Sequence, residues 1–446
     1  MKFLIIGGDA AGMSAASRAK RRRPDLEVIV LEQTMDVSYS ACGMPYNLAD
    51  PVRQMDDLVV RPAHVFREKQ DIDLRTGHRA EQIDRNSKKV KGAKNDGREF
   101  ELSYDKLLIA TGASPIKPPI EGIESPGVMC LKLLEDGRRI KSFIKENGVS
   151  RVVVIGMGYI ALEMSEALRA RDIEVSMVKP RPVLLPWMHP DLSAMVKEEL
   201  ERHGVSLYPG HNIQKIESSD RTLRVVCDDL VLEGQMVLVA VGVKPNSELA
   251  QEAGLFLGPS RAIAVDRQMR TSDPDIYAAG DCADAFHVVT GERTWVPLAL
   301  RANRAGWAVA DNVLGRSVEL DGIAGTAVFK VFDLQVARTG LNMKEADEAG
   351  FDPAQVVIKS RSRAHAHPGS SPILVHMVSD RKSGRLLGVQ MVGKEGVAHR
   401  INAAAVALHA KMTVADFVQC DLAYAPPFSP VWDPLLTAAN QLIKQM

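Results

Sequence analysis

Two glycine-rich turns, far apart in the sequence but alike in their surroundings, restrict what this chain can fold into. The first reads Gly7-Gly8-Asp9-Ala10-Ala11-Gly12 and the second reads Gly156-Met157-Gly158-Tyr159-Ile160-Ala161. Each follows a short apolar run and precedes an apolar helical segment and a second short apolar run. In a Rossmann unit such glycines let the chain turn tightly, so that N–H groups at the helix start approach a pyrophosphate. The pattern predicts an α/β chain with two nucleotide-binding units, and therefore two nucleotides.

The first unit is expected to be strand, helix and strand over residues 2–31. Glu32 closes it, and an acidic side chain about 20 residues after the glycines accepts a hydrogen bond from a ribose hydroxyl in this motif. Asp9 replaces the middle glycine of the G-x-G-x-x-G pattern, so this turn alone is a weak signal. The second copy, over residues 151–178, strengthens it.

Two later segments are consistent with nucleotide domains. Residues 107–112 form an apolar run that ends in Ala110-Thr111-Gly112, which predicts a buried strand followed by a turn. Residues 271–281 contain a turn, a short apolar strand and then Gly280-Asp281. An acid in that position is suited to bind a hydroxyl of a flavin.

A single thiol follows the first unit. Cys42 lies in the run Ser38-Tyr39-Ser40-Ala41-Cys42-Gly43-Met44-Pro45-Tyr46, and none of the other four cysteines is near enough in sequence to close a CxxC disulfide with it. Any disulfide at Cys42 is expected to form with a small-molecule thiol, unless a distant cysteine folds close to it. A reactive thiol must ionise near neutral pH, and Pro45 at a helix start would direct positive potential at the sulfur. The alternative is a buried, inert cysteine.

Composition limits the class of partner. The chain has 446 residues, with 56 Lys and Arg against 56 Asp and Glu, so no net charge draws it to nucleic acid or to an anionic membrane. No apolar stretch approaches a membrane span and no signal peptide is visible, so a cytoplasmic protein is expected. Five cysteines without regular spacing argue against a disulfide scaffold and a zinc module, and no metal site is predicted.

In order, these motifs resemble those of the pyridine nucleotide–disulfide oxidoreductase superfamily. Within it they are similar to the single-cysteine branch of coenzyme A-disulfide reductases, CoA-dependent sulfur (polysulfide) reductases and NAD(P)H oxidases. The resemblance covers essentially the whole chain, including the late Tyr424-Ala425-Pro426-Pro427-Phe428. It implies two Rossmann-like domains and a C-terminal α+β dimerisation domain. The expected bounds are 1–115 and 246–322 for an FAD-binding domain, 116–245 for an NAD(P)-binding domain and 323–446 for a dimerisation domain.

The resemblance also implies which residues contact each cofactor. Those expected to bind FAD are Gly7, Ala10, Ala11, Gly12, Glu32, Thr111, Gly112 and Asp281. Those expected to bind NAD(P)H are Gly156, Gly158, Tyr159, Ile160, Glu163, Lys179 and Arg181. Within these sets Tyr159 resembles the aromatic residue that shields the flavin until the nicotinamide displaces it, and Glu163 resembles the acid beside the nicotinamide. A core aromatic and a helix surface charge are the alternatives.

The first glycine turn indicates the branch. Peroxidases and water-forming oxidases of this group carry a histidine inside that turn, and here the position is Ala10. The turn is instead similar to that of the CoA-disulfide and CoA-dependent sulfur reductases. The predicted activity is therefore FAD-dependent NAD(P)H reduction of CoA disulfide, CoA persulfide or polysulfide through Cys42.

Basic residues after the same turn fit a CoA substrate. Arg18 and Arg22 would share one helix face, and guanidinium groups suit phosphate geometry. The alternative is a solvated helix end favoured by the macrodipole. The residues that the resemblance associates with CoA are Arg18, Arg22, Ser38, Arg61, Asn303, His367 and Arg400.

Tyr424 is the candidate proton donor to the departing thiolate. In the resembled family this tyrosine reaches the cysteine of the other subunit, which implies a homodimer whose active sites are completed by dimerisation. The alternative is a tyrosine packed in a Pro-rich loop. A Tyr-Tyr-Pro segment of CoA-disulfide reductases is replaced by His365-Ala366-His367-Pro368-Gly369. His367 either donates a proton instead or has no chemical role.

The end of the second strand bears on the choice of nicotinamide. Where an NAD enzyme places a carboxylate, this chain has Val178-Lys179-Pro180-Arg181. Lys179 and Arg181 could meet a 2′-phosphate, so NADPH is expected to be used at least as well as NADH.

Three other functions remain open on the sequence. An NAD(P)H oxidase that reduces oxygen is the nearest, because reduced flavins pass electrons to oxygen. A non-catalytic redox sensor and a ferredoxin-type reductase are more distant, since neither has a use for Cys42.

Overall fold

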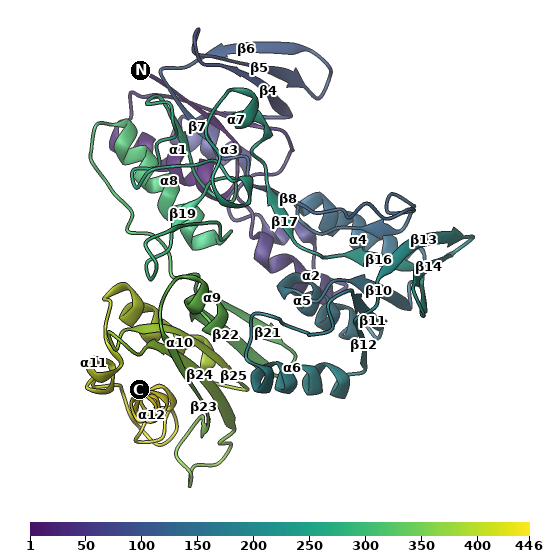
Figure 1. Ribbon diagram of the computed structural model, residues 1–446. Coiled ribbons are helices and arrows are strands. Elements are labelled where there is room, and N and C mark those ends of the chain that lie inside the picture. The colour runs from purple at the N-terminus through teal and green to yellow at the C-terminus, as the bar shows by residue number, and fades with distance from the viewer.

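The computed structural model describes residues 1–446, and its three large sheets, each of five strands, are two parallel sheets and one antiparallel sheet (Figure 1). The first parallel sheet has the order β18-β7-β1-β2-β3. Its strands are β1 Lys2–Ile6, β2 Glu27–Glu32, β3 Asp73–Thr76, β7 Lys106–Ile109 and β18 Ile276–Ala278. Almost every residue of β1 is buried, as expected for a strand covered on both faces. The predicted first unit is confirmed, with α1 Ala10–Arg22 between β1 and β2.

The second parallel sheet repeats this arrangement with the order β12-β11-β10-β16-β9. Its strands are β9 Val128–Met129, β10 Arg151–Ile155, β11 Glu174–Lys179, β12 Val205–Pro209 and β16 Met236–Val239. Helix α5, Tyr159–Arg169, connects β10 to β11, so the second predicted unit is confirmed. The other helices of this part are α4 Leu134–Glu146 and α6 Pro190–Arg202.

The chain leaves the first sheet and returns to it through two paired strands. β8, Ala113–Pro115, follows the first sheet, and β17, Val243–Pro245, leads back toward it. The two strands are antiparallel, with Ala113 opposite Pro245. β18 then joins the edge of the first sheet beside β7, and helix α8, Ala299–Val313, packs against α1. The first sheet is therefore assembled from two separate stretches of sequence.

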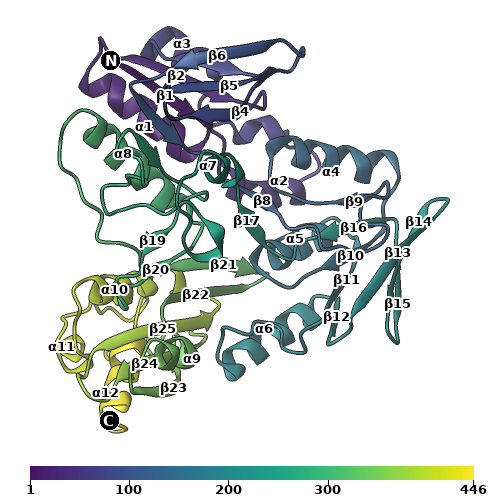
Figure 2. The same cartoon turned by 45° about the horizontal axis from the view of Figure 1, so that its top comes forward.

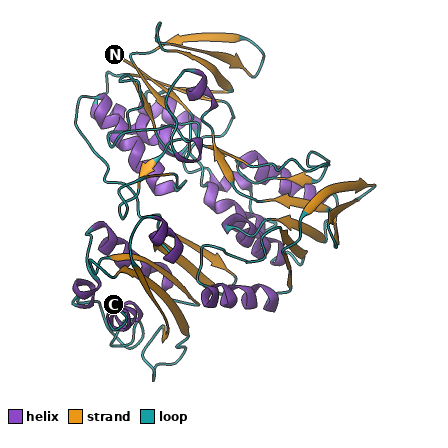
Figure 3. Ribbon diagram, viewed as in Figure 1, coloured by secondary structure: helices purple, strands orange, loops and turns teal.

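The C-terminal part is an antiparallel sheet with helices, as expected for an α+β domain. The strand order is β21-β22-β25-β24-β23. The strands are β21 Ala327–Val331, β22 Leu334–Gly340, β23 Pro353–Arg361, β24 Pro372–Asp380 and β25 Leu386–Gly393. The helices are α9 Met343–Glu348, α10 Val397–His409, α11 Val414–Val418 and α12 Pro434–Ile443, and α10 and α12 pack on the sheet. Figure 3 shows this grouping of strands and helices at the end opposite the N-terminus.

Several smaller elements complete the fold, and the turned view shows β4–β6 and β13–β15 at its periphery (Figure 2). Two three-stranded antiparallel sheets are formed by β4 His78–Asp84, β5 Lys89–Lys94 and β6 Glu99–Ser103, and by β13 Ile213–Ser219, β14 Thr222–Cys227 and β15 Val231–Gly234. The remaining elements are α2 Met44–Ala49, α3 Ala63–Gln70, α7 Glu248–Glu252, β19 Ala285–Phe286, β20 Arg293–Thr294 and 3₁₀ turns at Ala41–Gly43, Met55–Leu58 and Pro259–Arg261. No helix has both the length and the apolar character needed to span a bilayer.

Candidate active site

A cavity of about 2560 Å³ lies where the three parts of the chain meet. Both glycine turns line it, together with Cys42, Asp281 and, from the C-terminal part, Phe329. The carboxyl ends of β1 and β10 therefore open into one space. A cavity of this size has room for two dinucleotides side by side.

The first glycine turn is built for close backbone contact. Gly7 has φ +113°, and a Cβ there would lie 2.2 Å from the carbonyl oxygen of Ala110. A Cβ on Gly12 would lie 1.9 Å from the carbonyl oxygen of Gly7. No side chain fits at either position, so the turn packs closely against the end of β7, and the residues that begin α1 line the cavity, where their N–H groups suit an anion. These residues fit a flavin dinucleotide pyrophosphate.

Glu32 ends β2 beside this turn. Its Oε2 accepts a hydrogen bond from the Gly8 N–H at 2.7 Å, and its Oε1 accepts from the Thr34 N–H at 2.7 Å and hydroxyl at 2.8 Å. These bonds hold the carboxylate at the sheet edge, where the lone pairs that remain suit a ribose hydroxyl.

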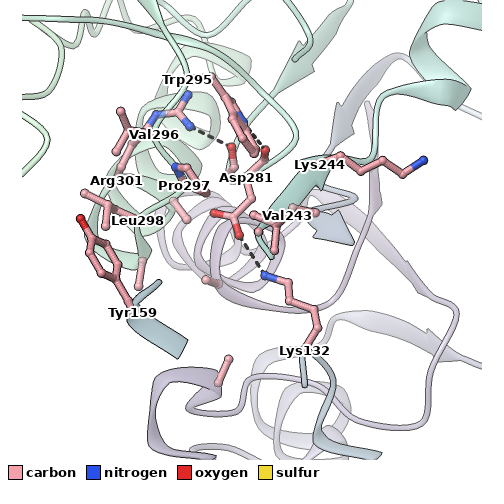
Figure 4. A pocket seen from close by; sticks show the side chains of 18 of the residues that line it. Lys132, Tyr159, Val243, Lys244, Asp281, Trp295, Val296, Pro297, Leu298 and Arg301 are labelled. Carbon is pink, nitrogen blue, oxygen red and sulfur yellow. Dashed lines mark hydrogen bonds and ion pairs between the residues drawn. The ribbon is translucent and has the colours of Figure 1, made fainter. Parts of the chain in front are cut away.

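Asp281 projects into the cavity and meets a lysine that the sequence analysis did not single out. The Lys132 ammonium lies 3.1 Å from Asp281 Oδ2, and Figure 4 shows the two side chains pointing at each other. The main chain at Asp281 is held by Trp295, whose Nε1 donates to the Asp281 carbonyl at 2.8 Å. Arg301 also donates to the adjacent Gly280 carbonyl at 2.9 Å. Lys132 precedes α4, in a segment with no recognisable motif.

Asp9 adds a second carboxylate beside Lys132 and Asp281. It stands at the N-cap of α1 and lines the cavity. Burial raises its pKa to about 6, with the charges of Glu32 and Asp281 acting in the same direction and the charge of Lys132 acting against them. The position at which the sequence departs from the glycine pattern thus carries a group that titrates near neutral pH.

Cys42 lies in the 3₁₀ turn Ala41–Gly43, directly before α2. Pro45 occupies the first turn of α2, as predicted. All five cysteines are free; Cys42 is exposed toward the cavity, whereas Cys130, Cys227 and Cys282 are buried. Protein atoms around the Cys42 thiol raise its pKa, the Glu163 carboxylate raises it further, and Lys132 lowers it.

A hydrogen bond ties the Cys42 segment to the second nucleotide unit. The Tyr46 hydroxyl donates to Glu163 Oε1 at 2.7 Å, and Glu163 lies on α5. Burial raises the pKa of Glu163, while the bond from Tyr46 lowers it. The charge of Glu163 also reaches the Cys42 thiol, whose pKa it raises.

The second glycine turn repeats the geometry of the first. Gly156 has φ +115°, and a Cβ there would lie 2.3 Å from the Ala240 carbonyl oxygen. Gly158 and Ile160 also line the cavity, so this turn too leaves the start of its helix open to an anion. The Tyr159 ring is half-buried and lies 4.6 Å from the ring of Phe329.

Lys179, the last residue of β11, and Arg181, two residues beyond it, line the same cavity. Lys179 Nζ donates to the Leu184 carbonyl at 2.8 Å, and burial and the charge of Arg181 lower the pKa of Lys179. Arg181 is exposed. Residues 179–189 contain no Asp or Glu. No carboxylate at this strand end would therefore repel a ribose 2′-phosphate.

The predicted CoA residues on α1 contact α8. Arg18 donates to Asp311 Oδ2 from Nε at 3.0 Å and from a terminal nitrogen at 2.6 Å, and Arg22 lies 3.6 Å from the same carboxylate. The Arg18 guanidinium also covers the Trp307 ring at 5.3 Å. Asn303 accepts from Ser14 at 2.5 Å and lines the cavity. Arg18 and Arg22 do not line it.

Four further predicted CoA residues and Tyr424 lie outside the cavity lining. Ser38 has φ +49°, and its carbonyl accepts from Val60 and Arg61. Tyr424 is 48% exposed. His367 is half-buried in the loop before β24.

Arg400 is held inside the C-terminal part. It donates to Asp433 Oδ2 at 2.7 Å, to the Phe428 carbonyl at 2.8 Å and to the Gly396 carbonyl at 3.0 Å. These bonds fix the segment that carries Tyr424. Within one chain, the structure therefore brings Cys42 together with both nucleotide motifs, but not with Tyr424, His367 or Arg400.

The chain matches two family models. Residues 1–306 match the model described as pyridine nucleotide-disulphide oxidoreductase, and residues 326–435 match its dimerisation domain. A relative from Pyrococcus furiosus, named NAD(P)H sulfur oxidoreductase (CoA-dependent), is 40% identical over 442 residues, which are 99% of each chain. An NADH oxidase from Methanocaldococcus jannaschii is 35% identical over 450 residues, covering 100% of this chain and 99% of the oxidase.

A solved structure shows the same fold. The NAD-dependent persulfide reductase from A. fulgidus superposes with a TM-score of 0.96 at 40% identity, covering 100% of this chain and 83% of that one. The family assignment from sequence is consistent with the fold, which has two Rossmann units and a C-terminal α+β part. The chain belongs to the pyridine nucleotide-disulphide oxidoreductase family.

Proposed function

We propose that this chain is an FAD-dependent NAD(P)H oxidoreductase that reduces CoA disulfide, CoA persulfide or polysulfide through Cys42. The observation that carries the proposal is that Cys42 is the cysteine that lines the cavity shared by both glycine turns. The names of the P. furiosus relative and of the A. fulgidus structure support the substrate class.

The first glycine turn, Glu32 and Asp281 would hold FAD, and the second glycine turn with Lys179 and Arg181 would hold the nicotinamide dinucleotide. The flavin supplies, when bound, the pair of electrons that the nicotinamide donates as hydride. Tyr159 and Phe329 line the cavity and would shield the reacting atoms from water. Lys132 places a positive charge beside Asp281 and lowers the pKa of the nearby thiol.

Cys42 performs the sulfur chemistry. Its thiolate attacks one sulfur of the substrate disulfide, so that a Cys42–S–S–R bond forms and the second thiolate leaves. Two electrons then break that bond, which returns Cys42 to the thiolate and releases the R thiolate. Two protons convert the released thiolates to thiols. Tyr46 and Glu163 hold a proton near Cys42 within the chain.

The chain is proposed to act as a homodimer. The match to a dimerisation domain and the exposure of Tyr424 and Phe428 support this arrangement. Tyr424 of one chain would then donate a proton to the thiolate released at Cys42 of the other. The proposal also includes contacts between CoA and the residues Arg18, Arg22, Ser38, Arg61, Asn303, His367 and Arg400.

Anaerobic titration with NADPH, with and without CoA disulfide, tests the function. The wild type is expected to release CoA thiol, and Cys42→Ser is expected to be reduced at the flavin without releasing any. Cys420→Ser, which changes a half-exposed thiol outside the cavity lining, is the matched control and should behave as wild type. Equal behaviour of the wild type and Cys42→Ser would overturn the proposal.

Reduction of oxygen is the second candidate, because a relative 35% identical to this chain is named NADH oxidase. Turnover with oxygen as sole acceptor that exceeds turnover with CoA disulfide and polysulfide would favour it.

A further inference from the structure

The Tyr159 ring belongs to an aromatic cluster drawn from two parts of the chain. Phe329 of β21 lies 4.6 Å from it, and Trp187, from the loop after β11, lies 5.8 Å away and nearly perpendicular to it. Trp187 and Phe329 are 6.5 Å apart. Tilted and edge-on pairs at these separations are favoured arrangements of aromatic rings. The position of the Tyr159 ring therefore depends on two neighbours outside its own helix.

Trp187 is held from its other side by the C-terminal part. The Arg338 guanidinium covers the Trp187 ring at 5.1 Å, and Arg338 is fixed by Glu345 at 2.7 Å. The Trp187 carbonyl accepts from Asn342 at 3.1 Å and from Gln390 at 2.9 Å. Trp187 thus bridges the second nucleotide unit and the antiparallel sheet.

The loop over residues 180–189 joins Trp187 to the basic end of β11. At its start, Lys179 Nζ donates to the Leu184 carbonyl at 2.8 Å, and Arg181 is exposed. Lys179, Arg181, Leu184, Trp187 and Tyr159 all line the same cavity. An anion that binds the Lys179 ammonium would break its hydrogen bond to the Leu184 carbonyl. That hydrogen bond restrains the loop.

Resting on the proposed use of NADPH, we propose that Trp187 is a positioning residue for the Tyr159 ring, and that the loop 180–189 transmits binding of a ribose 2′-phosphate to that ring. The phosphate draws Lys179 away from Leu184, the loop relaxes, and Trp187 repacks. The Tyr159 ring then loses its edge contact and moves aside for the nicotinamide. The 2′-phosphate favours the arrangement in which the Tyr159 ring is displaced, because the Lys179 ammonium is free to bind the phosphate only in that arrangement.

Tryptophan emission of the holoenzyme tests the link. The chain has four tryptophans, and Trp187→Phe identifies the part of the signal that comes from Trp187. Adenosine 2′,5′-bisphosphate, which has the 2′-phosphate but no nicotinamide, is expected to change the Trp187 emission. Adenosine 5′-monophosphate is expected not to change it. A response only to intact NADP⁺ would show that the nicotinamide displaces the ring directly, which overturns the link.

Affinity for NADP⁺ tests the positioning role. Trp187→Leu removes an aromatic contact that favours the closed ring, so the dissociation constant should fall about three- to tenfold. Trp187→Phe keeps an aromatic contact and should bind close to wild type. The same affinity in all three proteins would overturn the positioning role. If Trp187→Leu does not fold, the emission comparison of the wild type with Trp187→Phe still decides the proposal.

Failure of this inference is distinguishable from failure of the proposed function. If adenosine 2′,5′-bisphosphate does not bind, or binds without an emission change, the inference is wrong, while release of CoA thiol in the Cys42 experiment would leave the function standing. If neither NADPH nor NADH reduces the flavin, the function is wrong, and the emission response still reports on the loop.

Discussion

The Tyr46 hydroxyl donates a hydrogen bond to Glu163 at 2.7 Å, and the two residues come from different nucleotide units. Tyr46 lies one helical turn beyond Cys42, and Glu163 lies on the helix that follows the second glycine turn. Glu163, a residue of the proposed nicotinamide site, thereby contacts the helix that follows Cys42, and its charge raises the pKa of the Cys42 thiol.

Glu163→Gln is expected to lower the pKa of Cys42. Burial raises that pKa, and the Glu163 carboxylate raises it further, so its removal favours the thiolate. The rate of alkylation by iodoacetamide should rise at pH 7 and level off at lower pH than in wild type, measured in a Cys420→Ser background. Glu166→Gln, one turn along α5, is the control. An unchanged profile would contradict the assignment.

Lys132→Gln is expected to shift the same profile in the opposite direction. Lys132 lowers the pKa of Cys42, and its ammonium neutralises Asp281 at 3.1 Å. Without it, fewer Cys42 thiols are ionised at pH 7 and alkylation slows. Lys132→Arg should restore most of the rate, because it keeps the charge. A profile that does not move would show that the charge of Lys132 does not reach Cys42.

Asp9→Asn is expected to tighten FAD binding at pH 8 but not at pH 5. Burial raises the pKa of Asp9 to about 6. Above that pH the carboxylate is charged and repels a pyrophosphate at the start of α1, while below it the carboxyl is neutral. The effect at pH 8 should be about tenfold in the dissociation constant, read from the fluorescence of released flavin.

Asp25→Asn, an exposed change in the same unit, should have no effect at either pH. A tightening by Asp9→Asn that is equal at pH 5 and pH 8 would mean that the Asp9 charge is not its cause.

Arg181→Ala is expected to raise the KM for NADPH about tenfold and leave the KM for NADH unchanged. The exposed guanidinium is suited to meet a 2′-phosphate, which NADH lacks. Steady-state rates with both nucleotides measure this. An equal change in KM for NADPH and NADH would show that Arg181 does not contact the 2′-phosphate.

Arg400→Ala is expected to destabilise the protein by about 3 kcal/mol, because it leaves the buried Asp433 carboxylate without its partner. Thermal melting measures the loss. Lys344→Ala, which removes an exposed ion pair, should change stability by less than about 0.5 kcal/mol. A stable Arg400→Ala protein that binds CoA weakly would instead make Arg400 a ligand.

The two strand–helix–strand units could be predicted from local sequence pattern alone. The two glycine turns and the apolar runs beside them predicted β1, α1, β2 and their counterparts β10, α5 and β11, because strand period and turn chemistry are properties of neighbouring residues. Glu32 and Asp281 could be placed at the cavity for the same reason, since each directly follows a predicted strand.

Contacts between distant segments could not be predicted in this way. Lys132 meets Asp281 across 149 residues of sequence, and Trp187 reaches Tyr159 from a loop with no repeating pattern. The bonds of Arg400 to Asp433 and Phe428 depend on how α10 packs, so its position in the helix did not reveal them. For Asp9 a signal was present, because an acid replaces a glycine in a turn predicted to bind phosphate.

The pairing of β8 with β17 means that the chain departs from the first sheet and comes back at neighbouring points, with Ala113 opposite Pro245. A stretch whose two ends meet can be cut out and the gap closed by a few residues, or replaced by a stretch from another protein whose ends are equally close. The segment between these two strands is in this sense a single insertion with one two-stranded attachment, and its packing of α5 against α2 means that a replacement would also have to match that surface.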